Sequence, residues 1–163
     1  MDVRQARTGD AAAIAEVHTR VWQHAYEDIF GAERLAAIDV SARAEGWRRS
    51  LERDEPAFVA EEDRRVIGFA SVGASRDPDA DAELYAIYVL PEAWGGGTGA
   101  ALLRAGAEAL RDAGYREAIL WVLEDNPRAR RFYEREGWTL DGARRDDDVV
   151  GVRVAEVRYR RTL

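Results

Sequence analysis

The chain has 163 residues, 47% hydrophobic and 34% charged, and this length predicts one compact domain over residues 1–163 with a substantial core. Its formal charge of −7 argues against a nucleic-acid partner, because phosphate backbones attract basic surfaces. Cysteine and lysine are both absent, which excludes disulfides, thiolate metal sites, cysteine nucleophiles and lysine-dependent sites.

Hydropathy indicates neither a membrane span nor a secretory leader. The longest mainly apolar run, residues 84–103, contains Pro91, Glu92 and three consecutive glycines. The N-terminal residues lack the apolar core of a signal peptide. We therefore expect a cytoplasmic protein with no membrane partner.

Hydrophobic spacing in the first 75 residues predicts a strand over 3–7, a helix, a second helical region over 32–38 and 41–53, and a hairpin of strands 57–61 and 66–75. Thr8 or Asp10 is the expected cap of the first helix, and Ser41 is the expected cap of the later one. The apolar stripe of the first helix consists of Ile14, Val17, Val21 and Ala25.

The second half predicts strands and helices in alternation. We expect a strand over 83–89, a helix over 98–113 closed by Gly114, and a strand over 117–123. Asn126 and Pro127 have the pattern of a helix start, and Gly137 ends that helix. Strands 138–144 and 152–160 are expected to flank a charged turn at 144–148. This order favours an α/β (α+β) fold, a mixed sheet with helices on both faces.

A glycine-rich turn, WGGGTGAALL, lies where the strand over 83–89 gives way to a helix. Glycines let backbone N–H groups approach a ligand closely, and the first N–H groups of a helix favour a phosphate. Gly95, Gly97 and Ala100 fit only the looser form of the dinucleotide-binding pattern, and a Walker loop would need a lysine. The turn alone predicts a phosphate-bearing ligand, or a turn without any ligand.

Two longer segments resemble the signatures of the GNAT superfamily of N-acetyltransferases. ELYAIYVLPEAWGGGTGAALL is similar to its cofactor-binding signature, and LWVLEDNPRARRFYEREGW is similar to its second signature. The resemblance covers nearly the whole chain. Trp94 is a departure, because Gln or Arg most often begins the family's glycine motif. The resemblance implies a mostly antiparallel sheet of about seven strands, with a splayed parallel pair forming the cleft for acetyl-CoA.

The resemblance also implies which residues bind acetyl-CoA. Main-chain groups of Ile87 and Val89 would pair with the pantetheine arm, the N–H groups of the glycine turn would hold the pyrophosphate, and Asn126 would face the middle of the cofactor or act as a plain helix cap. The expected cofactor-binding residues are Ile87, Tyr88, Val89, Trp94, Gly95, Gly96, Gly97, Thr98, Gly99, Ala100, Asn126, Ala129, Phe132 and Tyr133.

Acetyl transfer to an amine requires loss of a proton from the amine, a donor for the developing oxyanion and a proton for the departing thiolate. By resemblance, the backbone N–H near Ile87 serves the oxyanion and Tyr133 is the general acid. Glu83 occupies the place where several family members carry a general-base glutamate, although it could be an ordinary charged residue. Strand alternation puts Glu83, Tyr85, Ile87 and Val89 on one face, if no bulge intervenes.

The acceptor is a primary amine of a small molecule or a protein. Its expected contacts are Trp22, Tyr26, Glu83 and Tyr85. His18 and His24 are six residues apart, which is not a helical metal pair, and no metal is expected. Acidic residues at 77–83 and 146–148 would attract a cation if they lined the cleft, or they could be solvated loops.

The preferred function is an acetyl-CoA-dependent N-acetyltransferase acting by direct attack, since no serine stands in a nucleophile motif. Two other functions stay open: a non-catalytic sensor of acyl-CoA, and a nucleotide-binding protein that uses the same glycine turn. A homodimer through the last strands is a family-level expectation.

Overall fold

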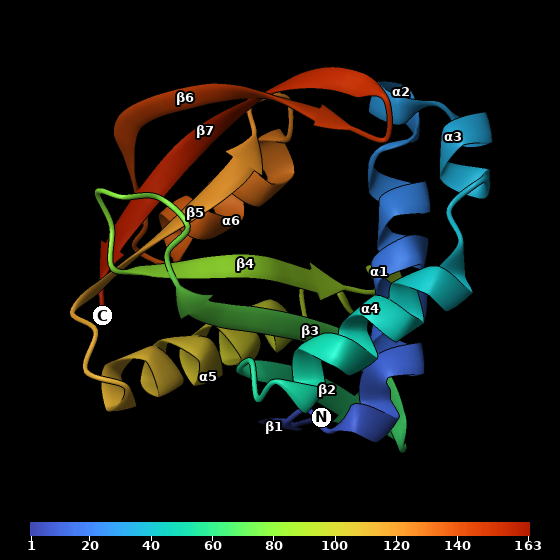
Figure 1. Ribbon diagram of the computed structural model, residues 1–163, viewed down its shortest axis with the longest axis horizontal. Helices are drawn as coiled ribbons and strands as arrows, with labels where there is room; N and C mark the ends of the chain where they lie inside the picture. The colour runs from blue at the N-terminus through green and yellow to red at the C-terminus, as the bar shows by residue number, and fades with distance from the viewer.

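A computed structural model describes all 163 residues and contains one seven-stranded sheet (Figure 1). The strands are β1 (Asp2–Gln5), β2 (Ala57–Glu62), β3 (Arg65–Ala74), β4 (Ala82–Val89), β5 (Glu117–Leu123), β6 (Thr139–Val149) and β7 (Val152–Thr162). The helices are α1 (Ala11–Ala25), α2 (Glu27–Phe30), α3 (Ala32–Ala36), α4 (Val40–Glu52), α5 (Thr98–Asp112) and α6 (Pro127–Arg135).

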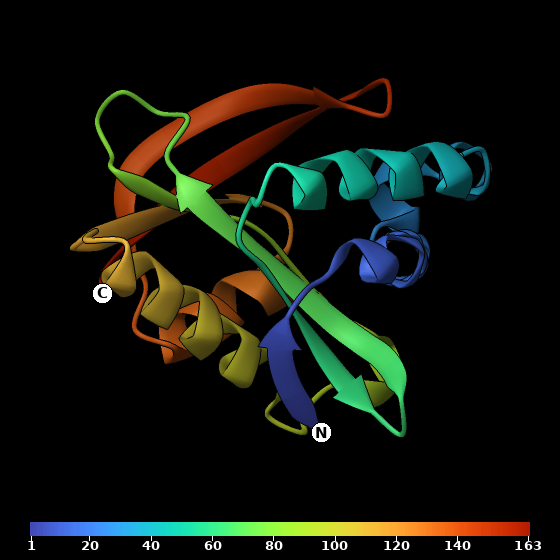
Figure 2. The same ribbon diagram turned by 60° about the horizontal axis from the view of Figure 1, so that its bottom comes forward.

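The helices lie on both faces of the sheet, as the element order predicts. In Figure 2, α5 lies on one side of β2–β4, and α1 and α4 lie on the other. Gly106 of α5 allows close packing on that side, because a Cβ there would come within 2.9 Å of Val72 Cγ1. Phe69 points to the opposite side, where its ring contacts Trp47 of α4.

The strand order is β1-β2-β3-β4-β5-β7-β6, and every neighbouring pair is antiparallel except β4 and β5. That parallel pair is joined only at Ala82–Ala118 and Glu83–Ile119. Beyond these residues the two strands diverge, so the inner edges of both are left without a strand partner. The mixed sheet with a splayed parallel pair is confirmed.

A bulge in β4 changes the predicted alternation. Ser71 of β3 pairs with Ala86 and the next residue, Val72, pairs with Leu84, so Tyr85 is the extra residue. Ile87 keeps to the α5 side, whereas Tyr85 contacts Gly73 and lines a small cavity beside α4. The expectation that Glu83, Tyr85, Ile87 and Val89 share one face is therefore wrong.

The predicted charged turn at 144–148 is also wrong, because these residues belong to β6. The turn lies at Val150 and Gly151, both with positive φ. The many charged residues of this segment give no hydrophobic pattern that would indicate a strand. Its side chains are largely exposed because β6 is an edge strand, and they form cross-strand ion pairs such as Arg153–Asp146.

Smaller differences lie in the N-terminal helices. The short α2 was not expected, and Ala25, predicted for the apolar stripe of α1, is exposed. The cap of α4 is Asp39, whose carboxylate accepts from the Ala42 N–H at 2.9 Å, and not Ser41. None of the helices combines the length and the apolar composition that a bilayer crossing requires.

Candidate active site

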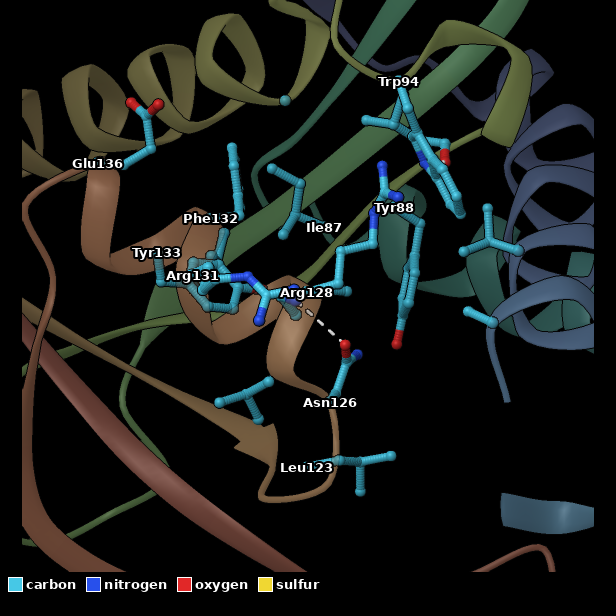
Figure 3. Close-up of a pocket in the computed structure, with 18 of the residues that line it drawn as sticks. Ile87, Tyr88, Trp94, Leu123, Asn126, Arg128, Arg131, Phe132, Tyr133 and Glu136 are labelled. Atoms are coloured by element: carbon cyan, nitrogen blue, oxygen red, sulfur yellow. Dashed lines mark hydrogen bonds between the residues drawn. The ribbon is translucent and has the colours of Figure 1, made fainter. Parts of the chain in front are cut away.

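A cleft of about 830 Å³ opens where β4 and β5 diverge (Figure 3). Its walls come from α1, β4, the glycine turn, β5, α6 and the β6–β7 hairpin. Every predicted cofactor-binding residue except Gly96 lines it. Of the four predicted acceptor contacts, Trp22, Tyr26 and Tyr85 line it and Glu83 does not.

The β4 wall offers unpaired backbone groups. The Leu90 N–H donates to the Ile67 carbonyl at 2.8 Å, so the even-numbered residues at this end of β4 bond to β3. Antiparallel strands alternate in this way, and Ile87 and Val89 therefore direct their N–H and C=O groups towards the gap. The Trp94 indole donates to the Val89 carbonyl at 2.7 Å. An extended ligand arm can add to the remaining groups as a strand would.

The glycine turn presents a second row of donors. Gly95 and Gly97 have φ of 80° and 83°, a region that favours glycine, and no atom lies near where their Cβ atoms would be. The first intrahelical bond from this turn runs from the Ala101 N–H to the Gly97 carbonyl. The N–H groups of residues 98–100 thus have no helical acceptor and can bind an anion.

Trp94 stands between α1 and α6 at the mouth of the cleft. The Arg128 guanidinium lies 3.5 Å from the centre of its ring, and His24 contacts it edge-on at 5.3 Å. Figure 3 shows the Arg128 side chain crossing the cleft towards Trp94, with Arg131 beside it. Sequence reasoning missed both arginines, although the NPRARR run at a helix start was a visible sign of positive charge.

Asn126 both caps α6 and faces the cleft. Its Oδ1 accepts from the Ala129 N–H at 3.1 Å, which confirms the predicted cap. Its Nδ2 donates to the Tyr26 hydroxyl at 3.4 Å and so joins α6 to the end of α1.

Tyr133 is buried on α6 and its hydroxyl has no hydrogen-bond partner in the protein. Burial, with a smaller effect of Tyr88, raises the pKa of Tyr133, so the phenol keeps its proton at neutral pH. Its neighbour Phe132 packs on Gly99, where a Cβ would come within 3.0 Å of Phe132 Cζ. Phe132 thus packs α6 against α5, and both Phe132 and Tyr133 line the cleft.

Glu83 is 1% exposed and is held by one residue. Its Oε2 accepts from the backbone N–H and the Nε of Arg76, both at 3.1 Å, and its Oε1 accepts from Arg76 Nη2. The bond to Glu83 raises the pKa of Arg76 against the opposing effect of burial. The Arg76 guanidinium also lies over the Tyr85 ring at 4.9 Å.

The acidic loop before β4 is anchored to β7 by ion pairs. Arg158, 7% exposed, donates to Asp77 at 3.0 Å and to both carboxylate oxygens of Asp79 at 2.8 and 2.7 Å. The Trp121 indole also donates to Asp77 at 2.9 Å. These carboxylates anchor the loop and are not free to attract a cation, and neither they nor residues 146–148 line the cleft.

The two histidines differ in environment. His18 stacks on Tyr88 with ring centres 4.9 Å apart, and burial lowers its pKa to about 3. His24 is exposed. No cluster of three His, Asp or Glu side chains has the geometry of a metal site.

The structure adds several cleft residues that sequence reasoning did not select. They include Phe30, Trp121, Leu123, Arg128, Arg131, Arg135, Glu136, Val149 and Glu156. Glu156 had a detectable signal, since it follows Val152 and Val154 at strand alternation and is the point where that face changes from apolar to charged residues.

Comparison with known proteins supports this geometry. A family model described as the acetyltransferase (GNAT) family matches residues 12–138. The chain is 36% identical over 160 residues to the uncharacterized N-acetyltransferase YuaI of Bacillus subtilis, covering 95% of this chain and 89% of that protein. It is 31% identical over 137 residues to an uncharacterized N-acetyltransferase of Mycobacterium bovis, covering 83% and 86%.

A solved structure has the same fold. The putative acetyltransferase yncA of Salmonella typhimurium, determined with its cofactor acetyl-CoA, matches with a TM-score of 0.75 at 24% identity. The match covers 99% of this chain and 93% of that one.

Proposed function

Because this chain belongs to the acetyltransferase (GNAT) family and is an acetyl-CoA-dependent N-acetyltransferase, we propose that its acceptor is a primary amine, which attacks directly in a ternary complex. One observation carries the proposal: the cleft at the splay of β4 and β5 is lined both by the donor-side groups (the β4 edge, the glycine turn and Tyr133) and by the proposed acceptor contacts Trp22 and Tyr26, so that donor and acceptor can meet in it directly.

The cleft fits the donor in shape and in chemistry. Backbone groups of Ile87 and Val89 suit the pantetheine arm, and the glycine turn with its open space at Gly95 and Gly97 suits the pyrophosphate. Arg128 and Arg131 add positive charge to the phosphate-binding half. Acetyl-CoA supplies a thioester whose carbonyl carbon accepts the amine.

Tyr133 is the proposed acid of the reaction. The amine nitrogen forms the amide bond, the carbon–sulfur bond breaks, and the Tyr133 hydroxyl donates its proton to the departing sulfur. The proton that the neutral amine loses as the amide forms passes through water or Glu83 to the Tyr133 phenolate, which restores the acid. A buried phenol suits this role because it is protonated when the step begins.

Glu83 is the proposed base, and Arg76 controls it. Since Arg76 bonds to both carboxylate oxygens, Glu83 acts only if this pair opens or a water relays the proton. Glu83 also lies outside the cleft, and a relay is therefore the arrangement that we propose.

Two measurements test the function in sequence. Thermal unfolding with acetyl-CoA, CoA, NAD and ATP at equal excess should show a higher midpoint only with the CoA compounds, since a ligand at a hundred times its Kd stabilises by about 2.7 kcal/mol. Initial rates of thiol release with amines should then give intersecting double-reciprocal lines. Parallel lines would indicate a covalent acetyl-enzyme and contradict direct attack.

A further inference from the structure

The cleft has two parts with different chemistry. Five charged residues line it. Four of them belong to α6 or cap its C-terminal end, and these are Arg128, Arg131, Arg135 and Glu136. The fifth is Glu156 on β7. The part bounded by α1, α2 and the β6–β7 hairpin, which we call the acceptor pocket, therefore contains a single charged side chain.

Glu156 is positioned by the sheet. It pairs with Leu123 of β5 on one side and with Arg145 of β6 on the other. Its side chain is 13% exposed, and its Oε2 accepts from Arg145 Nε at 2.6 Å. Its Oε1 receives no hydrogen bond from the protein. One carboxylate oxygen thus remains available to a ligand in an otherwise apolar pocket.

Arg145 holds Glu156 in place and is itself held. Its guanidinium lies over the Trp121 ring at 4.2 Å, which fixes it on the β5–β7 surface. Arg145 does not line the cleft. Glu156 is therefore the only member of this pair that a ligand in the cleft would contact.

The rest of the acceptor pocket is aromatic and aliphatic. Trp22 stacks on Phe30 with centres 5.6 Å apart, and Tyr26 meets both rings edge-on. Leu123 and Val149 complete the wall. The far end of the β6–β7 hairpin lies beside α2 (Figure 1), and its Val149, Val152 and Val154 pack against the cluster that contains Phe30. Arg43 packs on Trp22 and donates to Thr19, and it does not line the cleft.

We propose that Glu156 binds the acceptor as its ammonium ion, which gives up one proton to water before the neutral amine attacks, and that the acceptor is a primary amine with one positive charge, an apolar or aromatic body and no carboxylate. The proposal rests on the proposed function and names the acceptor class for the same site. A carboxylate on the substrate would face Glu156 with no cation in the pocket to balance it. A second ammonium would be desolvated among the aromatic rings without a counter-charge.

Three amines distinguish these classes: 2-phenylethylamine, phenylalanine, which adds a carboxylate to the same body, and putrescine, which has two charges. We expect kcat/KM for 2-phenylethylamine to exceed that for either of the others at least tenfold. Glu156→Gln should raise the KM for 2-phenylethylamine about tenfold or more, with a smaller change in kcat and an unchanged Kd for acetyl-CoA. Glu156→Asp keeps the charge and should recover part of the loss.

Glu124→Gln is the matched control, because Glu124 forms a similar pair with Arg144 at 3.0 Å but lies outside the cleft. It should leave the KM for the amine unchanged. Equal or better use of phenylalanine or putrescine, or an unchanged KM in Glu156→Gln, overturns the proposal. Acetyl-CoA binding without acetylation of any of the three amines also overturns it. Failure of the wild-type protein to bind acetyl-CoA would instead contradict the proposed function.

Discussion

The guanidinium of Arg128 lies 3.5 Å from the centre of the Trp94 indole, and this contact joins the first turn of α6 to the glycine turn across the mouth of the cleft. The Trp94 indole N–H donates in turn to the Val89 carbonyl. Trp94 is thus held from two sides. Its contact with Arg128 keeps the guanidinium charge near the N–H groups that we assign to the pyrophosphate.

Replacement of Arg128 should weaken binding of the nucleotide part of the donor. We expect Arg128→Ala to raise the Kd for acetyl-CoA about tenfold, corresponding to about 1.4 kcal/mol, because a charge-assisted contact to phosphate is lost. Calorimetry measures this change. The KM for acetyl-pantetheine, which lacks the pyrophosphate, should not change, and an equal effect on both donors would show that Arg128 acts only through folding.

Tyr133→Phe tests the proposed acid. Loss of the hydroxyl should lower kcat about 10²-fold, within the usual range for general acid catalysis, while the Kd for acetyl-CoA stays the same. Tyr115→Phe, outside the cleft, is the matched control and should retain full activity. A wild-type kcat in Tyr133→Phe would exclude the phenol as proton donor.

The role of Glu83 is tested by replacing it and its partner separately. We predict that Glu83→Gln lowers kcat/KM for the amine about 10²-fold, within the usual range for general base catalysis. Arg76→Ala keeps the carboxylate and should retain more activity than Glu83→Gln. A wild-type kcat/KM in Glu83→Gln would mean that the Arg76–Glu83 pair only anchors the loop before β4.

His18 should make folding stability depend on pH. Burial lowers its pKa from 6.5 to about 3 in the folded protein, so between these values the unfolded chain binds the extra proton. The contribution of the neutral ring to the free energy of unfolding is therefore complete above pH 6.5. It is lost as the pH falls towards 3, and the free energy of unfolding then decreases by up to about 1.4 kcal/mol per pH unit.

Urea unfolding at pH 7, 6, 5 and 4 measures this slope. His18→Phe retains an aromatic ring against Tyr88 and Phe69 and should lose less stability on acidification than the wild-type protein. Equal slopes in the two proteins would contradict the prediction, because the remaining titrating groups are the same.

Local signals predicted those parts of the site that lie within one segment of chain. The glycine turn, the Asn126–Pro127 helix start and the place of Tyr133 in the second GNAT-like segment depend on residues a few positions apart, and the structure brings all of them to one cleft. Trp22 and Tyr26 reach the same cleft because they are one helical turn apart on α1. Their chemical roles stay predictions.

Features set by contacts between distant segments were not predictable in the same way. The bulge at Tyr85 depends on its register with β3, and it separates Glu83 from Ile87 despite their even spacing. The strand character of residues 144–148 depends on pairing with β7, because their charges are compatible with a turn or with an exposed edge strand.

Most of the elements, their order, the family and the glycine turn that opens α5 followed from local sequence, since backbone geometry and helix caps depend on neighbouring residues. Which charges are paired and which can reach a ligand depends on contacts between distant segments. Arg76 holds Glu83 outside the cleft, Arg158 pairs with Asp77 and Asp79, and the β5–β7–β6 register brings Glu156 into the acceptor pocket. A charge interacts most strongly with the groups within a few ångströms of it, and folding draws those groups from distant parts of the chain.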